Sequence, residues 1–177
     1  MTTGSNDQAH ISAVSEQDVD AVAQLAREIW YLHYPGIITV SQIDYMLAQR
    51  YQPDDIASQI KTDEAWWDKI AVGPELVGFA GYETGSDAAS VKLDKLYIHP
   101  RVQGRGFGYA LVRHVETRSR ERGFSRLYLQ VNKGNTASIA FYRRAGFAVT
   151  EKVVVDIGNG YVMDDFIMSK QLENPVP

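Results

Sequence analysis

The sequence predicts an α/β (α+β) protein, with a mixed, mostly antiparallel sheet of six to seven strands and helices on both faces. One observation is the order of the predicted elements: helices, three strands, a helix, a strand, a helix and two strands. The second is the length of 177 residues, which suits one hydrophobic core. The third is a composition of 45% hydrophobic and 23% charged residues, as in globular proteins.

The first part of the chain is predicted to be helical. Residues 15–32 carry apolar side chains at helical spacing, and Ser15 with Asp18 resembles a capping box. Pro35 and Gly36 end this helix, and a second one is expected from Ser41. A third is expected to begin at Pro53, because proline is favoured in the first turn and the two following residues are acidic.

Strands dominate the remainder of the chain. Residues 66–72 and 76–83 predict an antiparallel hairpin around the turn 73–75, and residues 90–98 alternate as a third strand. A glycine-rich loop then leads into a helix that runs to about residue 122.

A further strand is predicted over residues 126–132. The helix that follows is expected to have Asn135 as its N-cap and Gly146 at its C-terminal end. Residues 147–158 and 161–172 close the chain as a strand pair around the turn 158–160.

Composition and charge exclude several classes of function. A net charge of −4 argues against nucleic acid as a partner, and no apolar run approaches a membrane span. Cysteine is absent, and the four histidines (His10, His33, His99 and His114) show no metal-ligand spacing, so no metal site is expected. The polar start of the chain lacks the apolar core of a signal peptide, and a cytoplasmic location is expected. We expect a flexible N-terminus over 1–10, a single domain over 11–172 and a tail over 173–177.

The loop between the third strand and its helix is the main candidate site. Gly104, Gly106 and Gly108 lie directly before the helix, where the backbone can approach a ligand and unpaired amides favour phosphate. A tight turn without a ligand is the alternative. The spacing fits neither G-x-G-x-x-G, which would need glycine where Tyr109 stands, nor a P-loop ending in G-K-[ST].

The spacing that does fit is Q-x-x-G-x-G, formed by Gln103, Gly106 and Gly108, and it resembles the coenzyme A pyrophosphate loop of the GNAT family of N-acetyltransferases. About thirty residues later the stretch NKGNTASIAFYRRAGF resembles the second signature of that family. In it an asparagine opens a helix, a tyrosine follows seven residues later and a G-F pair ends it. The two motifs span residues 90–150 and imply the GNAT fold, with acetyl-CoA as co-substrate.

The resemblance implies a set of cofactor-binding residues. Backbone groups of the strand would bind the pantetheine arm, amides of the loop would bind the pyrophosphate, and the start of the following helix would complete the site. The set is Leu96, Tyr97, Ile98, Gln103, Gly104, Arg105, Gly106, Phe107, Gly108, Tyr109, Asn135 and Tyr142. Asn135 also has its structural role as a helix cap, and the arginines of the loop are as well explained by solvation.

Two catalytic residues follow from the same resemblance. Tyr142 would protonate the leaving thiolate, with helix packing as the alternative role. Asp94 would accept the proton of the amine, directly or through water. Strict alternation places Asp94 on the same face as Leu96 and Ile98, where the thioester is expected. Polyamine acetyltransferases resemble this chain but carry glutamate there, and the alternative is a surface aspartate paired with lysine. With no cysteine to carry an acetyl group, transfer would be direct within a ternary complex, with a strand amide stabilising the oxyanion.

The acceptor is expected to be a primary amine. The predicted lining of its site is aromatic and acidic, comprising Trp30, Tyr31, His33, Tyr34, Asp44, Tyr45, Asp156, Asp164 and Asp165. The whole chain also resembles bacterial spermidine/spermine N-acetyltransferases, which favours a polyamine or other small amine. A protein N-terminus is the second candidate and an amino-acid or antibiotic amine the third. A non-catalytic acetyl-CoA sensor and a nucleotide-binding module are the alternatives of another class, and a homodimer is left open.

Overall fold

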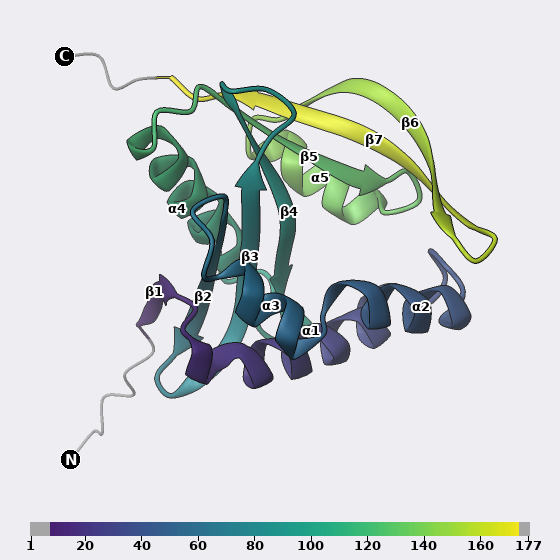
Figure 1. Cartoon of the computed structure of the whole chain (residues 1–177), viewed down its shortest axis with the longest axis horizontal. Helices are drawn as coiled ribbons and strands as arrows, with labels where there is room; N and C mark the ends of the chain where they lie inside the picture. Colours follow the sequence, from purple (N-terminus) through teal and green to yellow (C-terminus); the bar gives the residue numbers. More distant parts are fainter. Residues whose placement is uncertain (1–7, 174–177) are drawn as a thin grey trace.

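The computed structural model describes residues 8–173 and contains seven strands, five α-helices and two short 3₁₀ turns within that range (Figure 1). The helices are α1 (Val19–His33), α2 (Val40–Arg50), α3 (Pro53–Gln59), α4 (Phe107–Glu121) and α5 (Thr136–Arg144). The strands are β1 (Ala9–Ala13), β2 (Ala65–Val72), β3 (Glu75–Thr84), β4 (Ser90–Ile98), β5 (Arg126–Asn132), β6 (Ala148–Gly158) and β7 (Tyr161–Gln171).

All seven strands belong to one sheet, with the order β1-β2-β3-β4-β5-β7-β6. Every neighbouring pair is antiparallel except β4 and β5, which are parallel and are connected through α4. The sheet is therefore mixed and mostly antiparallel, which confirms the predicted fold class.

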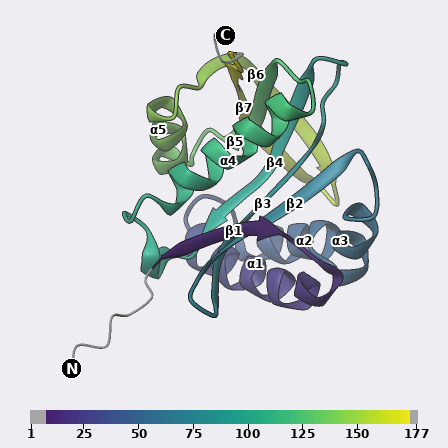
Figure 2. The ribbon, with the colours of Figure 1, turned by 90° about the vertical axis from the view of Figure 1, so that its left-hand side faces the viewer.

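Helices cover both faces of the sheet (Figure 2). Helices α1, α2 and α3 lie on one face, where Trp30, Ile43 and Phe79 belong to one buried cluster. Helices α4 and α5 lie on the other face, where Leu111 and Met168 belong to a second cluster. Each helix buries one apolar side, so the sheet is enclosed between two hydrophobic layers.

The largest departure from the predicted elements is β1, where no strand was expected. Its five residues pair antiparallel with β2 at the edge of the sheet, and His10 lies opposite Ala71. Residues 9 and 10 therefore belong to the sheet, although the flexible N-terminus was expected to extend to residue 10. Residues 1–7 and 174–177 lie outside the described part of the chain.

The ends of the predicted helices agree closely with the structure. Ser15 and Asp18 form the predicted capping box. It caps a 3₁₀ turn over Glu16–Asp18, and α1 starts directly after this turn at Val19. Asn135 caps α5 by accepting a hydrogen bond from the Ser138 amide, and Gly146 follows the helix with a φ of +94°. That conformation favours glycine, as the sequence predicted.

A bulge in β4 changes the expected orientation of Asp94. Gly81 of β3 pairs with Lys95 and Tyr82 pairs with Leu93, so Asp94 is an extra residue without a partner across the ladder. The inserted residue reverses the alternation of the strand. Asp94 consequently faces α2, whereas Leu96 and Ile98 face the opposite cluster, so the expectation that they share a face is wrong.

Strands β4 and β5 separate soon after they begin. Their register pairs residues 90–92 with 126–128, and within the described chain no pairing continues beyond Lys92. The rest of β4 therefore presents an open edge towards β5 in the middle of the sheet. The candidate site described below lies at this gap between the two strands.

Candidate active site

Two cavities meet at the open edge of β4. One has a volume of about 400 Å³ and is bounded by α1, α2, β4, β5 and the β6–β7 pair. The other has a volume of about 540 Å³ and extends along the glycine loop between β4, α4 and α5. Leu96, Ser138 and Tyr142 line both. The two spaces therefore adjoin at these residues, and we call them the α2 cavity and the loop cavity.

The loop cavity ends at a backbone cradle. Gly104 and Gly106 have φ angles of +80° and +82°, and a Cβ atom added to either would meet no atom within 4 Å. The first amide of α4 that bonds within the helix is that of Ala110, which donates to the Gly106 carbonyl at 3.0 Å. The amides of the first turn have no intrahelical acceptor. Open space beside unpaired amides at a helix N-terminus fits a pyrophosphate.

Most of the predicted cofactor-binding residues line the loop cavity. They are Leu96, Ile98, Gln103, Gly104, Gly106, Phe107, Gly108, Tyr109 and Tyr142. Gln103 donates its side-chain amide to the Ile98 carbonyl at 3.2 Å, which fixes the loop against the end of β4. Arg105 is not among the lining residues, and its guanidinium lies 5.0 Å from the centre of the Phe107 ring.

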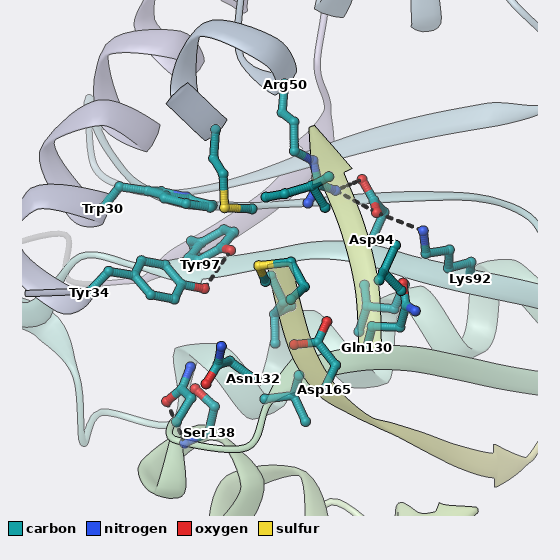
Figure 3. A pocket seen from close by; sticks show the side chains of 18 of the residues that line it. Trp30, Tyr34, Arg50, Lys92, Asp94, Tyr97, Gln130, Asn132, Ser138 and Asp165 are labelled. Carbon is teal, nitrogen blue, oxygen red and sulfur yellow. Dashed lines mark hydrogen bonds and ion pairs between the residues drawn. The ribbon is translucent and has the colours of Figure 1, made fainter. Parts of the chain in front are cut away.

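The remaining two predicted cofactor residues line the α2 cavity. Asn135 is 5% exposed, and its side-chain oxygen is used in the helix cap. Tyr97 is packed among the aromatic rings of α1 and α2, and its hydroxyl lies 3.0 Å from that of Tyr34 (Figure 3). The bulge explains this placement, because Tyr97 now points to the same side as Asp94.

Tyr142 occupies the junction between the cavities. Its side chain projects from α5 and is largely buried against Phe141 and Phe147. Burial raises the pKa of Tyr142 well above its ordinary value, and the nearby hydroxyl of Tyr34 adds to the effect. The phenol therefore keeps its proton throughout the neutral range.

Asp94 lies in a dense network of positive charge. The Arg50 guanidinium contacts both of its carboxylate oxygens at 2.7 Å and Lys92 approaches to 3.2 Å (Figure 3), and Lys95 forms a further ion pair. Burial alone would raise the pKa of Asp94, but these three cations outweigh it and hold the pKa well below its ordinary value. A carboxylate held in this way is a weak base. The pairing with lysine considered as the alternative for Asp94 is present.

Asp165 is the other carboxylate of the α2 cavity. It projects from β7, is 4% exposed, and its Oδ1 atom has no hydrogen-bond partner within residues 8–173 (Figure 3). Burial, together with the charge of the adjacent Asp164, raises the pKa of Asp165 to about 6. Within one cavity, the two carboxylates thus have opposite environments.

Only part of the predicted acceptor lining meets in this cavity. Trp30, Tyr34, Tyr45 and Asp165 line it. The others lie elsewhere: Tyr31 bonds to Asp44 outside the cavity, His33 lines the loop cavity, Asp156 accepts a hydrogen bond from the Gly158 amide, and Asp164 pairs with Lys133. The prediction missed Arg50 and Lys92, which bring positive charge into the lining. Arg50 ends α2, and no local pattern places it opposite β4.

Between residues 8 and 173 there is no group of three or more histidine, cysteine, aspartate or glutamate side chains arranged to hold a metal ion. None of the helices in the same range is long and apolar enough to cross a membrane.

Comparison with known proteins gives consistent matches. The Acetyltransferase (GNAT) family matches residues 20–147. A spermidine N(1)-acetyltransferase of Thermoplasma acidophilum is 26% identical over 93% of this chain and 98% of its own. A peptidyl-lysine N-acetyltransferase of Salmonella typhimurium is 31% identical over 68% of this chain and 76% of its own. Among solved structures, a PaiA N-acetyltransferase of Thermoplasma acidophilum in complex with coenzyme A has a TM-score of 0.82, with 23% identity over 93% of this chain and 99% of its own.

Proposed function

This chain belongs to the GNAT family of acetyltransferases, and from that premise we propose that it acetylates a primary aliphatic amine bound in the α2 cavity. It is an acetyl-CoA-dependent N-acetyltransferase. The observation that carries the proposal is the meeting of the two cavities at Tyr142, one with a phosphate cradle and the other with a buried carboxylate.

The loop cavity is proposed to bind acetyl-CoA. The amides at the start of α4, with Gly104 and Gly106, would bind the pyrophosphate, and the open edge of β4 would bind the pantetheine arm. The thioester would then lie near Leu96 and Tyr142, where the cavities join. Tyr97 would support the neighbouring aromatic wall through its contact with Tyr34 rather than touch the pantetheine with its side chain.

Tyr142 is proposed as the general acid. Its raised pKa keeps the phenolic proton in place, and its hydroxyl would donate to the sulfur as the carbon–sulfur bond breaks. A free thiol has a pKa of about 8.5, well below that of this phenol, but burial also raises the pKa of the departing thiol. In a buried site the departing thiolate is therefore a stronger base than a free thiolate in water.

Asp94 is proposed to organise the site rather than to act as its base. It holds Arg50 of α2 and Lys92 of β4 in the cavity wall and compensates the charge of the buried Lys95. Since all three cations favour its ionised form, protonation by an ammonium group is strongly disfavoured. This role replaces the proton transfer that the sequence suggested.

A polyamine or other small amine is proposed as the acceptor. The cavity is about 400 Å³ in volume, its aromatic residues Trp30, Tyr34 and Tyr45 suit an alkylammonium chain, and the spermidine acetyltransferase cited above resembles the chain over nearly its full length. Arg50 and Lys92 favour a competing candidate, an amino acid whose carboxylate would contact them. Both acceptors present an ammonium group to the same space.

The test is thiol release from acetyl-CoA in the presence of an amine panel. The panel contains spermidine, spermine, a monoamine, several amino acids and a peptide with a free N-terminus. We expect turnover of a small amine to exceed that of the peptide. Acetyl-CoA binding without thiol release with any amine would contradict the proposal and would favour a sensor domain.

A further inference from the structure

We propose that Asp165, and not Asp94, binds the ammonium group of the acceptor and accepts its proton. This inference rests on the proposed function, since it assigns a residue to the acceptor half of that reaction. It gives the α2 cavity a base on β7, a strand that contributes nothing to the two sequence motifs.

The position of Asp165 carries the inference. Its side chain points into the α2 cavity, is 4% exposed, and leaves Oδ1 without a protein partner in the described chain. A buried carboxylate oxygen normally has a hydrogen-bond donor, and one that lacks it is unfavourable unless a ligand supplies the donor. An ammonium group has three donors and the opposite charge. It is therefore the ligand that this oxygen lacks.

The surroundings of Asp165 keep it available as a base. Charged and titratable groups on several elements act on Asp165 electrostatically: Asp164 on β7, Arg50 on α2, Lys92 on β4, Lys133 after β5 and Tyr34 at the end of α1. Arg50 and Lys92 already contact Asp94, and Lys133 pairs with Asp164, so no cation forms an ion pair with Asp165 itself within residues 8–173. Its pKa of about 6 lies close enough to neutrality for efficient proton transfer.

The proton balance of the reaction is complete with this assignment. One N–H bond of the ammonium breaks as its proton moves to Asp165, and the freed lone pair forms the bond to the acetyl carbon. The carbon–sulfur bond breaks as sulfur takes the proton of Tyr142. The second proton that the nitrogen loses restores the phenol, and Asp165 releases its proton to solvent. The products are the amide, the thiol and one proton in solution.

The experiment compares Asp165→Asn with the parent protein, using the best amine of the panel. In the parent, kcat/KM should fall below about pH 6 as Asp165 becomes protonated. In the variant this acidic limb, the break near pH 6, should be replaced by a continuous fall of kcat/KM as the pH drops below the pKa of the amine, and kcat/KM at pH 7 should be lower by about 10²- to 10⁴-fold, the usual contribution of a general base. The loss should shrink as the pH approaches the pKa of the free amine, because the amine then arrives neutral.

An acceptor that is already neutral at pH 7 gives a readout that a structural role would not change. 2,2,2-Trifluoroethylamine has such a lowered pKa, and the Asn variant should lose less than about tenfold with it, since no proton needs to be removed before attack. An equal loss with both amines would overturn the role as base. Glu151→Gln neutralises an exposed carboxylate of β6 and is the matched control, with an unchanged profile expected.

The outcomes separate this inference from the proposed function. If the parent protein binds acetyl-CoA but acetylates no amine, the proposed function fails. If the parent is active and Asp165→Asn keeps both its rate and its acidic limb, only the assignment of Asp165 fails. In that case Asp94→Asn, measured in parallel, shows whether the limb belongs to the other carboxylate. Calorimetric affinity for acetyl-CoA should be the same in the parent and the Asp165 variant, because Asp165 does not line the loop cavity.

Discussion

Replacing Asp165 by asparagine should stabilise the folded protein at neutral pH and not at acidic pH. The reason is the unfavourable environment of the charged side chain, whose pKa rises from 3.8 to about 6 on folding. At 1.36 kcal/mol per pKa unit, this rise corresponds to about 3 kcal/mol of lost stability once the group is fully ionised. The N–H donors of the asparagine side chain would be buried without acceptors, which costs about 1 kcal/mol. A net gain of about 1–2 kcal/mol is therefore expected at pH 8.

The dependence on pH gives the sign of the effect. Below the unfolded pKa of 3.8 the carboxyl group is protonated in both states, so the variant has no electrostatic advantage there. Between 3.8 and about 6 the unfolded chain ionises while the folded protein stays protonated, so the stability of the parent falls as the pH rises. Above about 6 the difference between the two proteins is complete.

The assay is urea unfolding of both proteins at pH 4, 6 and 8, with equal m-values as the condition for comparison. Asp18→Asn is the control of opposite sign. Although burial opposes the effect, Lys69 and Ser15 lower the pKa of Asp18 to about 2, so its replacement should destabilise the protein at pH 4, 6 and 8, and a further measurement at pH 2 should show most of this cost gone. The reasoning is refuted if the Asp165 variant is less stable than the parent by the same amount at every pH.

Four other measurements test the site. Tyr142→Phe should lower kcat by about 10²-fold with an unchanged dissociation constant for acetyl-CoA, and a kcat within about threefold of the parent would contradict its role as acid. Gly106→Val places a branched side chain at a φ of +82° and into the cradle, so calorimetry should show acetyl-CoA affinity reduced by more than about tenfold in protein that remains folded. Asp94→Asn leaves Arg50, Lys92 and Lys95 without their shared counter-charge and should cost about 2–4 kcal/mol in urea unfolding at pH 7, a loss that diminishes as the pH falls below about 4. If a polyamine is the acceptor, its KM should rise with added salt, whereas a neutral peptide terminus would show no such dependence.

Local patterns were sufficient to predict the backbone geometry around the loop cavity. The glycine loop and the α5 signature are continuous stretches, and their glycines, cap and helix spacing specify backbone geometry within a few residues. Gly106 at a positive φ and Asn135 at the start of α5 are therefore where the sequence placed them. The order of elements likewise predicted the mixed sheet, with the short edge strand β1 as the exception.

The lining of the α2 cavity was less predictable, because it depends on contacts between distant segments. One inserted residue in β4 reversed the orientation of Asp94, and the alternation of the strand gives no sign of it. Arg50 reaches Asp94 across 44 positions of the chain, so the pairing that makes Asp94 a weak base is a property of the packing of α2. Asp165 appeared in the sequence as one of several acidic residues of the final hairpin, and only burial distinguishes it from Asp164.

The separation of β4 from β5 has a mechanical consequence. The parallel pairing that joins strands β1 to β4 with strands β5 to β7 covers three residue pairs, so few backbone hydrogen bonds connect the two halves of the sheet along this line. A ligand that bonds to the edge of β4 and contacts α5 would add bonds to both halves. Acetyl-CoA would then link the two halves as well as react, and at a free concentration [L] it would stabilise the fold by RT ln(1 + [L]/Kd). The α2 cavity lies across the same line, with β4 on one side and β5 and β7 on the other, so this link between the two halves would lie directly beside it.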